Sequence, residues 1–294
     1  MAIYRLENSR LGICVDSLGA ELKSLKNLGN GVEYMWDANP LYWNETSPVL
    51  FPFVGSLKNG VYRYGGKEYA VPKHGFAKDM EFELLRQTEE ELSFLLRADE
   101  GTKAMYPFDF ELEIGYRFDK EEEKKLVISW KVTNRGGQEM HFSIGGHPGF
   151  LCPPGGKGMQ TDCRLLFDTK DKIISSVVGT GSLLSERRRD YPLVDGMLDI
   201  TENLFEEDAL VIEQDQAHKV SLCDSSGAPF VTVSFDAPLF ALWAPAKKGV
   251  PFLCVEPWYG RCDRETFGGD LSQREYGNRL APSETFYAEY TILV

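Results

Sequence analysis

Two residues in this sequence have the types and settings that proton transfer requires, and the first is His147. It stands in the stretch Ser-Ile-Gly-Gly-His-Pro-Gly-Phe (143–150), where a strand pattern runs into two glycines and a proline follows the histidine. Glycine permits close approach of backbone or ligand, and proline biases the preceding residue to an extended backbone. The pattern predicts an imidazole held in one place at a strand end. A turn histidine in a Gly/Pro loop is the equal alternative.

The second residue is Glu256, which interrupts the apolar stretch Pro-Phe-Leu-Cys-Val-Glu-Pro-Trp-Tyr (251–259). A carboxylate at the end of such a run is partly desolvated, which raises its pKa and suits it to proton abstraction. The alternative is a strand-end glutamate that points to solvent. Trp258 and Tyr259 favour a cleft, since aromatic rings pack on the C–H faces of a pyranose, although both would also suit a core.

The other three histidines differ in setting. His74 follows a strand pattern and a proline in Val-Pro-Lys-His-Gly-Phe (71–76), and its imidazole can donate a hydrogen bond to a ring or hydroxyl oxygen. His141 begins a short apolar run, which favours a hydrogen-bonded strand position over a site. His218 lies in the polar segment Gln-Ala-His-Lys and is expected at the surface.

Strand patterns dominate the rest of the chain, and these elements must position the chemistry. Phe110–Phe118 alternates apolar and polar residues over nine positions, and Leu126–Val132 repeats that alternation after a charged hairpin connection. Residues 63–71 predict a second hairpin around Gly65 and Gly66. Further short strands are predicted at 82–84, 92–96, 211–213 and 231–235.

Helical patterns are scarce, and at most a turn or short helix is expected at 263–266. Strands of this length must bury one face against another layer, so we predict an all-β fold of large antiparallel sheets packed as a β-sandwich. The 294 residues are 43% hydrophobic and contain no linker-like segment, so a single domain over residues 1–294 is expected.

Composition excludes several classes of partner. The net charge of −13 argues against nucleic acid or an anionic membrane surface, because binding to phosphates depends on Lys and Arg. No signal peptide or apolar stretch of about 18 residues is found, so we expect a cytoplasmic protein. The six cysteines have neither CxxC nor zinc-site spacing and are interpreted as scattered, buried thiols.

Three stretches, taken in order, resemble the aldose 1-epimerase family and most of all its bacterial LacX-like branch. They are Pro-Lys-His-Gly-Phe-Ala-Lys-Asp-Met-Glu-Phe (72–82), Gly-Gly-His-Pro-Gly-Phe (145–150) and Phe-Leu-Cys-Val-Glu-Pro-Trp (252–258). The resemblance extends from Gly-Ala-Glu-Leu (19–22) to Leu-Ala-Pro-Ser-Glu-Thr-Phe (280–286), where many relatives have a Pro-Gly-Glu turn. No single motif is decisive, but the ordered set is specific.

The resemblance implies a galactose mutarotase-like β-sandwich (supersandwich) that needs no metal or organic cofactor and takes a small sugar as substrate. By resemblance, His147 protonates the ring oxygen and Glu256 removes the proton from the anomeric hydroxyl. His74 holds the ring oxygen or a hydroxyl, and Trp258 is expected to contact the sugar. Asp208 matches the family's substrate-binding aspartate, with Asp190 and Asp236 as alternatives. The chain is expected to be a monomer or homodimer.

One departure from the family pattern leaves the sugar open. Many relatives carry an arginine upstream of the His-Gly motif, where this chain has Phe-Val-Gly-Ser-Leu-Lys-Asn-Gly (53–60), so Lys58 is the candidate replacement. The predicted function is interconversion of hexose anomers. Two alternatives stay open: a hexose-6-phosphate 1-epimerase and a non-catalytic carbohydrate-binding module. For the first, candidates for a phosphate site are Lys73, Lys78, Arg261 and Arg274, although such side chains are more often solvated.

Overall fold

The alternating apolar pattern of the chain builds two large antiparallel sheets in the computed structural model, which describes residues 2–294. The larger sheet has nine strands, and its edges are β17 and β7. In spatial order these strands are β17 (Met197–Asp199), β14 (Arg164–Phe167), β19 (Lys219–Cys223), β20 (Pro229–Phe235), β24 (Thr285–Leu293), β10 (Lys125–Asn134), β9 (Phe110–Phe118), β8 (Glu91–Arg97) and β7 (Glu83–Gln87).

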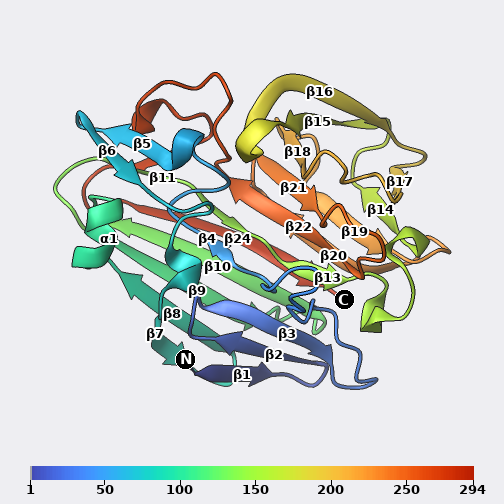
Figure 1. Cartoon of the computed structure of the whole chain (residues 1–294). Helices are drawn as coiled ribbons and strands as arrows, with labels where there is room; N and C mark the ends of the chain where they lie inside the picture. The colour runs from blue at the N-terminus through green and yellow to red at the C-terminus, as the bar shows by residue number, and fades with distance from the viewer. Residues whose placement is uncertain (1) are drawn as a thin grey trace.

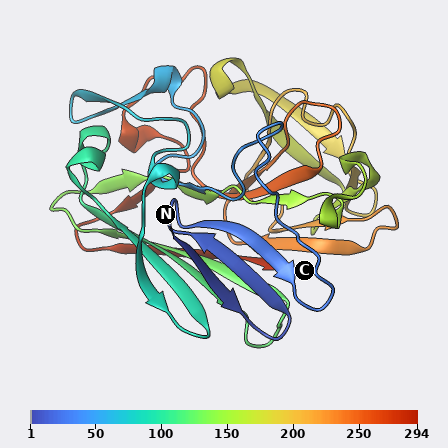
Figure 2. The ribbon, with the colours of Figure 1, turned by 60° about the horizontal axis from the view of Figure 1, so that its bottom comes forward.

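The second sheet carries the residues with candidate chemistry. In spatial order its strands are β16 (Leu184–Pro192), β15 (Lys172–Val178), β18 (Leu210–Glu213), β21 (Leu239–Trp243), β22 (Phe252–Tyr259), β12 (Ile144–Gly146) and β4 (Val49–Leu50), and β13 (Gly149–Leu151) also pairs with β22. Figure 1 shows β21 and β22 crossing the middle of the molecule. Figure 2 shows β7 to β9 in the lower layer and β15 and β16 in the upper one.

Three small sheets and a few single-turn helices complete the described chain. The sheets are β1 (Ile3–Glu7), β2 (Leu11–Asp16) and β3 (Glu21–Asn27), then β5 (Val61–Tyr64) with β6 (Lys67–Ala70), and β11 (Met140–Phe142) with β23 (Asn278–Leu280). The helices are α1 (Glu100–Met105) and the 3₁₀ turns η1 (Lys58–Gly60), η2 (Ala77–Asp79), η3 (Pro154–Gly156), η4 (Gln160–Asp162), η5 (Thr180–Ser182) and η6 (Leu271–Gln273). No helix within residues 2–294 is long and apolar enough to cross a membrane.

The predicted β-sandwich is confirmed, and the strongest strand pattern has the bounds that the sequence predicts. Strand β9 spans Phe110–Phe118 and alternates buried and half-buried residues, as the period of two requires. The hairpin around Gly65 and Gly66 is confirmed as β5–β6. The sequence missed α1, because its six residues are too few for a helical period and its start depends on the Asp99 capping box with Thr102.

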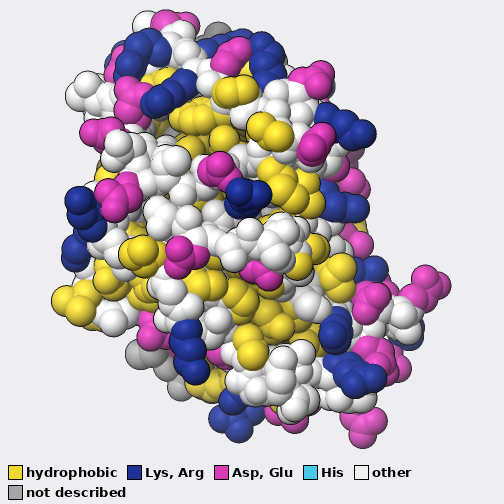
Figure 3. Space-filling model, turned by 90° about the vertical axis from the view of Figure 1, so that its right-hand side faces the viewer, with side chains coloured by type: hydrophobic (Ala, Val, Ile, Leu, Met, Phe, Trp, Pro, Cys, Tyr) yellow, Lys and Arg dark blue, Asp and Glu magenta, His cyan; other side chains and the backbone are white. Residues whose placement is uncertain are grey.

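The core lies between the two large sheets and draws side chains from β1 to β24. Trp130, Phe94 and Ile114 from the nine-stranded sheet are fully buried, as are Phe240 and Leu253 from the eight-stranded sheet. Most charged residues lie at the surface, and Figure 3 shows one face on which acidic and basic side chains are interspersed among hydrophobic ones. Burial of the apolar side chains in the core is the main contribution to the stability of the fold.

The two faces of β22 have different partners. Leu253 and Val255 point into the core between the sheets. Because side chains alternate along a strand, Cys254, Glu256 and Trp258 share the opposite face. On that face Trp258 packs in a second, smaller cluster with residues of β18 and β21. The Glu256 side chain therefore lies on the outer face of the eight-stranded sheet, which points away from the core between the sheets.

Candidate active site

The strand register around β22 brings together two chain segments more than a hundred residues apart. Strand β12 pairs Gly145 with Trp258, and β13 pairs Gly149 with Cys254. The register is the same on both sides of the gap between β12 and β13. The glycine at 145 is required by close packing, since a Cβ there would lie 2.6 Å from the Trp258 ring.

His147 and Glu256 lie midway between those two pairs, one on each segment. The backbone N–H of His147 donates to the Pro48 carbonyl at 3.1 Å, and the Pro148 carbonyl accepts from the Val255 N–H at 3.2 Å. The backbone at His147 is thus anchored on both sides of the imidazole. His147 Nε2 lies 3.3 Å from Glu256 Oε2.

Both side chains are removed from water, with His147 8% and Glu256 1% exposed. Burial, with smaller contributions from the nearby charges of Lys73 and Lys78, lowers the pKa of His147 to about 3. Burial also raises the pKa of Glu256 well above its usual value, and the charge of Asp208 adds to this rise. The low-dielectric setting therefore favours an uncharged pair, a neutral imidazole and a protonated carboxyl group, so that one titratable proton is shared by the two residues.

Neither catalytic candidate has its hydrogen-bonding capacity filled by the protein. Glu256 Oε2 and His147 Nδ1 are both buried without a hydrogen-bond partner. The 3.3 Å approach of His147 Nε2 to Glu256 Oε2 is not aligned as a hydrogen bond. Buried polar atoms are nearly always paired in folded proteins. Buried polar atoms without a hydrogen-bond partner at this position indicate that a ligand binds here.

Tryptophan rings enclose the imidazole. The Trp43 ring lies 4.7 Å from the His147 ring at a tilt of 31°, and Trp243 approaches it edge-on at 5.5 Å. Trp43 is itself stacked on Phe252 of β22. These rings exclude water from His147 and expose aromatic surface to the cavity, where C–H groups of a sugar can pack.

His74 is held by the backbone of Gly55 on two sides. Its N–H donates to the Gly55 carbonyl at 3.0 Å, and its Nδ1 accepts from the Gly55 N–H at 3.2 Å. The next residue, Gly75, has φ of 76°, and a Cβ there would lie 2.1 Å from the Phe51 carbonyl oxygen. The His-Gly pair therefore has a steric cause: only glycine fits where the chain passes Phe51.

The Gly55 contact fixes the tautomer of His74. Because Nδ1 accepts a hydrogen bond, the proton of the neutral imidazole lies on Nε2, which becomes a donor. Burial lowers the pKa of His74 well below its usual value, and the neighbouring His147 adds to this effect. The two imidazole rings meet edge to face at 5.6 Å. His74 is thus a neutral donor beside the His147–Glu256 pair.

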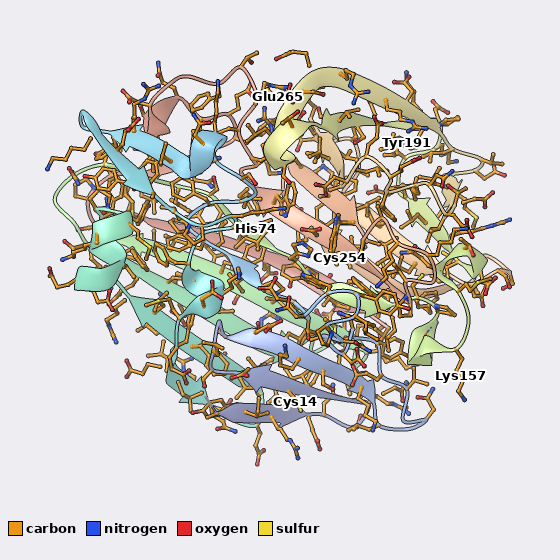
Figure 4. The ribbon with its side chains drawn as sticks, in the orientation of Figure 1. Cys14, His74, Lys157, Tyr191, Cys254 and Glu265 are labelled. Carbon is orange, nitrogen blue, oxygen red and sulfur yellow. The ribbon has the colours of Figure 1, made fainter. Side chains whose placement is uncertain are left out.

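These groups open into one cavity of about 380 Å³, a size suited to a small ligand. Figure 4 labels His74 near the centre of the molecule, and Cys254 of β22. The cavity is lined by Trp43, Glu45, Gly55, Lys73, His74, Lys78, His147, Val178, Ser182, Asp208, Ala209, Val211, Trp243, Glu256, Trp258 and Cys262. Five of the six site residues inferred from the sequence are among them.

The exception is Lys58, which lies outside the cavity lining. It begins the turn η1, and its backbone N–H donates to Asp263 Oδ2 at 2.9 Å. The cavity takes its lysines from the segment around His74 instead. Lys78 is paired with Glu45 at 2.8 Å and with Asp79 at 3.2 Å. Within residues 2–294 no acidic side chain lies within ion-pair distance of Lys73.

Asp208 is presented by a strained turn before β18. Its φ is 72°, a conformation that aspartate tolerates better than most residues. Its Oδ1 accepts from the Ala209 N–H at 2.8 Å, and Ser182 Oγ donates to its Oδ2 at 3.4 Å. Of the three aspartates weighed from the sequence, Asp208 is the one that lines the cavity; Asp190 pairs with Lys172 on the surface.

The sequence missed Trp43, Trp243 and Glu45 as cavity residues. Trp43 and Glu45 lie in an irregular segment with no strand or helix period, and Trp243 ends a strand in a way that also suits a core residue. The tryptophan that ends β21 is the one available signal in the sequence for a wall of the cavity. Nothing in the sequence indicated Trp43.

Arg261 and Arg274, two candidates for a phosphate site, are instead buried in fixed ion pairs. Arg261 Nε donates to Glu213 Oε1 at 2.7 Å and a further N–H pairs with Glu275. Arg274 Nε donates to Asp263 Oδ1, also at 2.7 Å. Their charges are neutralised beside the site, so the structure contradicts the expectation that they offer a free phosphate site.

Comparison with known proteins places the whole fold among proteins of one kind. The family model described as aldose 1-epimerase matches residues 2–267. Protein LacX, chromosomal, from Lactococcus lactis subsp. lactis is 30% identical over 298 residues, which cover 98% of each chain. A solved galactose mutarotase related enzyme from Lactobacillus acidophilus is 32% identical with a TM-score of 0.90, covering 99% of this chain and 97% of that one. A galactose mutarotase-like protein from Lactobacillus casei has a TM-score of 0.91 at 24% identity, with 99% of each chain covered, and supports the fold alone.

Proposed function

Because this chain belongs to the aldose 1-epimerase family, we propose that it interconverts the α and β anomers of an aldohexose by acid–base ring opening and closure. His147 acts as the acid and Glu256 as the base. The observation that carries the proposal is the position of these two side chains, 3.3 Å apart at the wall of one sugar-sized cavity.

The geometry suits the two oxygens that exchange protons in this reaction. The ring oxygen O5 and the anomeric oxygen O1 are both bonded to C1, so an acid and a base must reach atoms that are close neighbours. His147 Nε2 and Glu256 Oε2 are a matching distance apart. Glu256 Oε2 accepts no hydrogen bond within the protein, so it is free to accept the proton of O1.

The reaction proceeds without net change in the protons of the pair. Ring opening starts from imidazolium and carboxylate: Glu256 takes the O1 proton, the C1–O5 bond breaks, and His147 gives its Nε2 proton to O5. The aldehyde at C1 then rotates by half a turn about the C1–C2 bond. On reclosure O5 returns its proton to His147, and Glu256 protonates the aldehyde oxygen on the new face.

Burial keeps one proton on the pair, which both halves of this cycle need. The lowered pKa of His147 disfavours a second proton, and the raised pKa of Glu256 disfavours loss of the only one. Imidazole with carboxylic acid, and imidazolium with carboxylate, are both net neutral and differ by one proton transfer across the contact. The form with imidazole and carboxylic acid is the one present while the sugar is in its open-chain form.

The remaining cavity residues hold the ring in place. The Nε2–H of His74 is directed to a ring or hydroxyl oxygen, and the Asp208 carboxylate accepts from sugar hydroxyls. Trp258, Trp43 and Trp243 supply aromatic surface for the C–H groups of the pyranose. Such contacts fix the position of C1 relative to the acid and base, and this positioning accounts for part of the acceleration.

One observation favours a second candidate, an epimerase that acts on a phosphorylated hexose. Lys73 lines the cavity without an acidic partner among residues 2–294, so its ammonium group is available to an anionic substituent. A single lysine beside Glu45 and Asp208 is a weak phosphate site, so the neutral hexose remains the first proposal.

Anomer exchange measured by NMR tests both candidates and the non-catalytic alternative. With α-D-glucose or α-D-galactose freshly dissolved, catalytic amounts of the protein should speed the approach to anomeric equilibrium. Acceleration confined to glucose 6-phosphate would replace the first proposal by the second. Saturable sugar binding without acceleration of any anomer exchange would indicate a binding module and contradict both.

A further inference from the structure

The catalytic pair has a third neighbour that the proposed reaction does not use, the thiol of Cys254. One ligand atom from each of His147, Cys254 and Glu256 lies within 4.8 Å of the other two, and all three residues are buried. Cys254 and Glu256 are alternate residues on one face of β22, and Cys254 is paired with Trp243 and Gly149. Since glycine has no side chain, nothing on β13 comes between the thiol and the pair.

We propose that His147, Cys254 and Glu256 form a three-ligand site for Zn²⁺, and that Zn²⁺ bound there blocks the proposed epimerase reaction. Nitrogen, sulfur and carboxylate oxygen are the ligands that zinc takes from proteins. The site is independent of the proposed function as a binding site, and depends on it only for the inhibition.

The spacing of the ligands is close to what a tetrahedral ion needs. With zinc–ligand bonds of about 2.0–2.3 Å, neighbouring ligand atoms lie roughly 3.3–3.8 Å apart. His147 Nε2 and Glu256 Oε2 already have such a spacing, at 3.3 Å. Closure of the thiol by about 1 Å completes the set.

Charge and hydrogen bonding also favour a dication at this position. Binding deprotonates the thiol and the carboxyl group, and the two negative charges then match the charge of Zn²⁺, so no net charge remains buried. Glu256 Oε2, which is buried and has no hydrogen-bond partner, gains a coordination bond to the ion. The fourth coordination position faces the cavity, where a water molecule can occupy it.

Inhibition follows because zinc takes the electron pairs that the reaction uses. A metal-bound carboxylate and imidazole cannot exchange protons with O1 and O5. Zinc should therefore compete with sugar, and EDTA should restore activity in full.

The test uses cadmium as a spectroscopic probe and zinc as an inhibitor, on the full chain. Titration with Cd²⁺ should produce the ultraviolet charge-transfer band of a cadmium–thiolate bond, saturating at one ion per chain. Cys254→Ser should abolish this band and raise the Zn²⁺ concentration for half inhibition at least about 10-fold, with each variant compared with its own metal-free rate.

Two control variants separate this site from the other cysteines. Cys262→Ser removes the thiol that lines the cavity, and Cys223→Ser removes a buried thiol on β19 in the other large sheet. Both should bind Cd²⁺ as the unaltered protein does. A wild-type protein without a cadmium–thiolate band, or a band and zinc sensitivity that persist in Cys254→Ser, would overturn the proposal. Thermal unfolding of the metal-free variants checks that each is folded.

Discussion

Two buried glutamates in this protein sit beside a cation-forming side chain, and they differ in what that partner can do. Glu213 is 5% exposed and is bound by Arg261 at 2.7 Å, with a further hydrogen bond from Ser176. Glu256 is 1% exposed and faces His147 at 3.3 Å. A guanidinium group keeps its proton at any physiological pH, whereas an imidazole can take one up and give it back.

The difference assigns the two pairs to different tasks. The Glu213–Arg261 pair is hydrogen-bonded and neutralised, and it joins β18 to the segment after β22. The Glu256–His147 pair has unfilled hydrogen-bonding positions and opens into the cavity. Similar burial thus gives a fixed cross-link in one place and a movable proton in the other.

The largest effect is expected when the movable proton is removed. Glu256→Gln and His147→Asn should each lower the rate of anomer exchange by at least about 10²-fold, since each removes one general acid or base. Glu213→Gln, the matched change in the fixed pair, should leave the rate per folded molecule within about 3-fold. NMR exchange rates of the three variants make the comparison. Equal losses in Glu213→Gln and Glu256→Gln would abolish the distinction.

The same variants should rank in the opposite order for stability. Glu213→Gln leaves the buried Arg261 with a weaker partner and should lower the free energy of unfolding by about 3 kcal/mol. Glu256→Gln replaces a carboxyl group that its raised pKa keeps uncharged by an uncharged amide of similar size, so stability should stay nearly unchanged. Denaturant unfolding monitored by tryptophan fluorescence measures both. A Glu256→Gln protein less stable than Glu213→Gln would contradict this reading of the two pairs.

A smaller effect is expected at the neutral donor beside the pair. His74→Ala removes the Nε2–H that is directed to the sugar and should raise KM about 10-fold, the value of one hydrogen bond to the ligand. His141, whose Nε2 lies 3.2 Å from Glu139 outside the cavity, supplies the control. His141→Ala should leave KM unchanged. A rise of KM in both variants would indicate a general structural effect.

The smallest expected change is in the pH dependence of the metal-free enzyme, measured in EDTA. Because the pKa of His147 is lowered to about 3, the second proton that would inactivate the pair is taken up only at acidic pH. Because the pKa of Glu256 is raised, the only proton is lost well above the usual glutamate range. The rate should therefore vary little through pH 6.5, the ordinary pKa of histidine. A fall in rate centred there would place the pair in water.

Much of the fold could be predicted from the sequence, because its information is local. The alternation at 110–118 specifies β9 to the residue, since one face of that strand must be buried. His147 and Glu256 stood out because each interrupts an apolar strand pattern with a group that can titrate. Such an interruption is costly unless the structure gives it a partner or a use.

The arrangement of the site could not be predicted, because it depends on contacts between distant segments. The register that puts 147 opposite 256 is set by two separate strand pairings, β12 and β13 with β22. The tautomer of His74 depends on the Gly55 N–H, nineteen residues away. The choice of Lys58 failed for the same reason, since only the folded chain shows that η1 lies outside the cavity lining.

His147 and Glu256 are expected to act as one unit, and the exchange rate of the double variant His147→Asn/Glu256→Gln measures this directly. If one proton is passed between them through the sugar, removal of either partner already stops the reaction. The double variant should then be no slower than the slower single variant, within about 3-fold. Losses that multiply, so that two 10²-fold effects give about 10⁴-fold, would mean that the two residues act independently and would contradict the account.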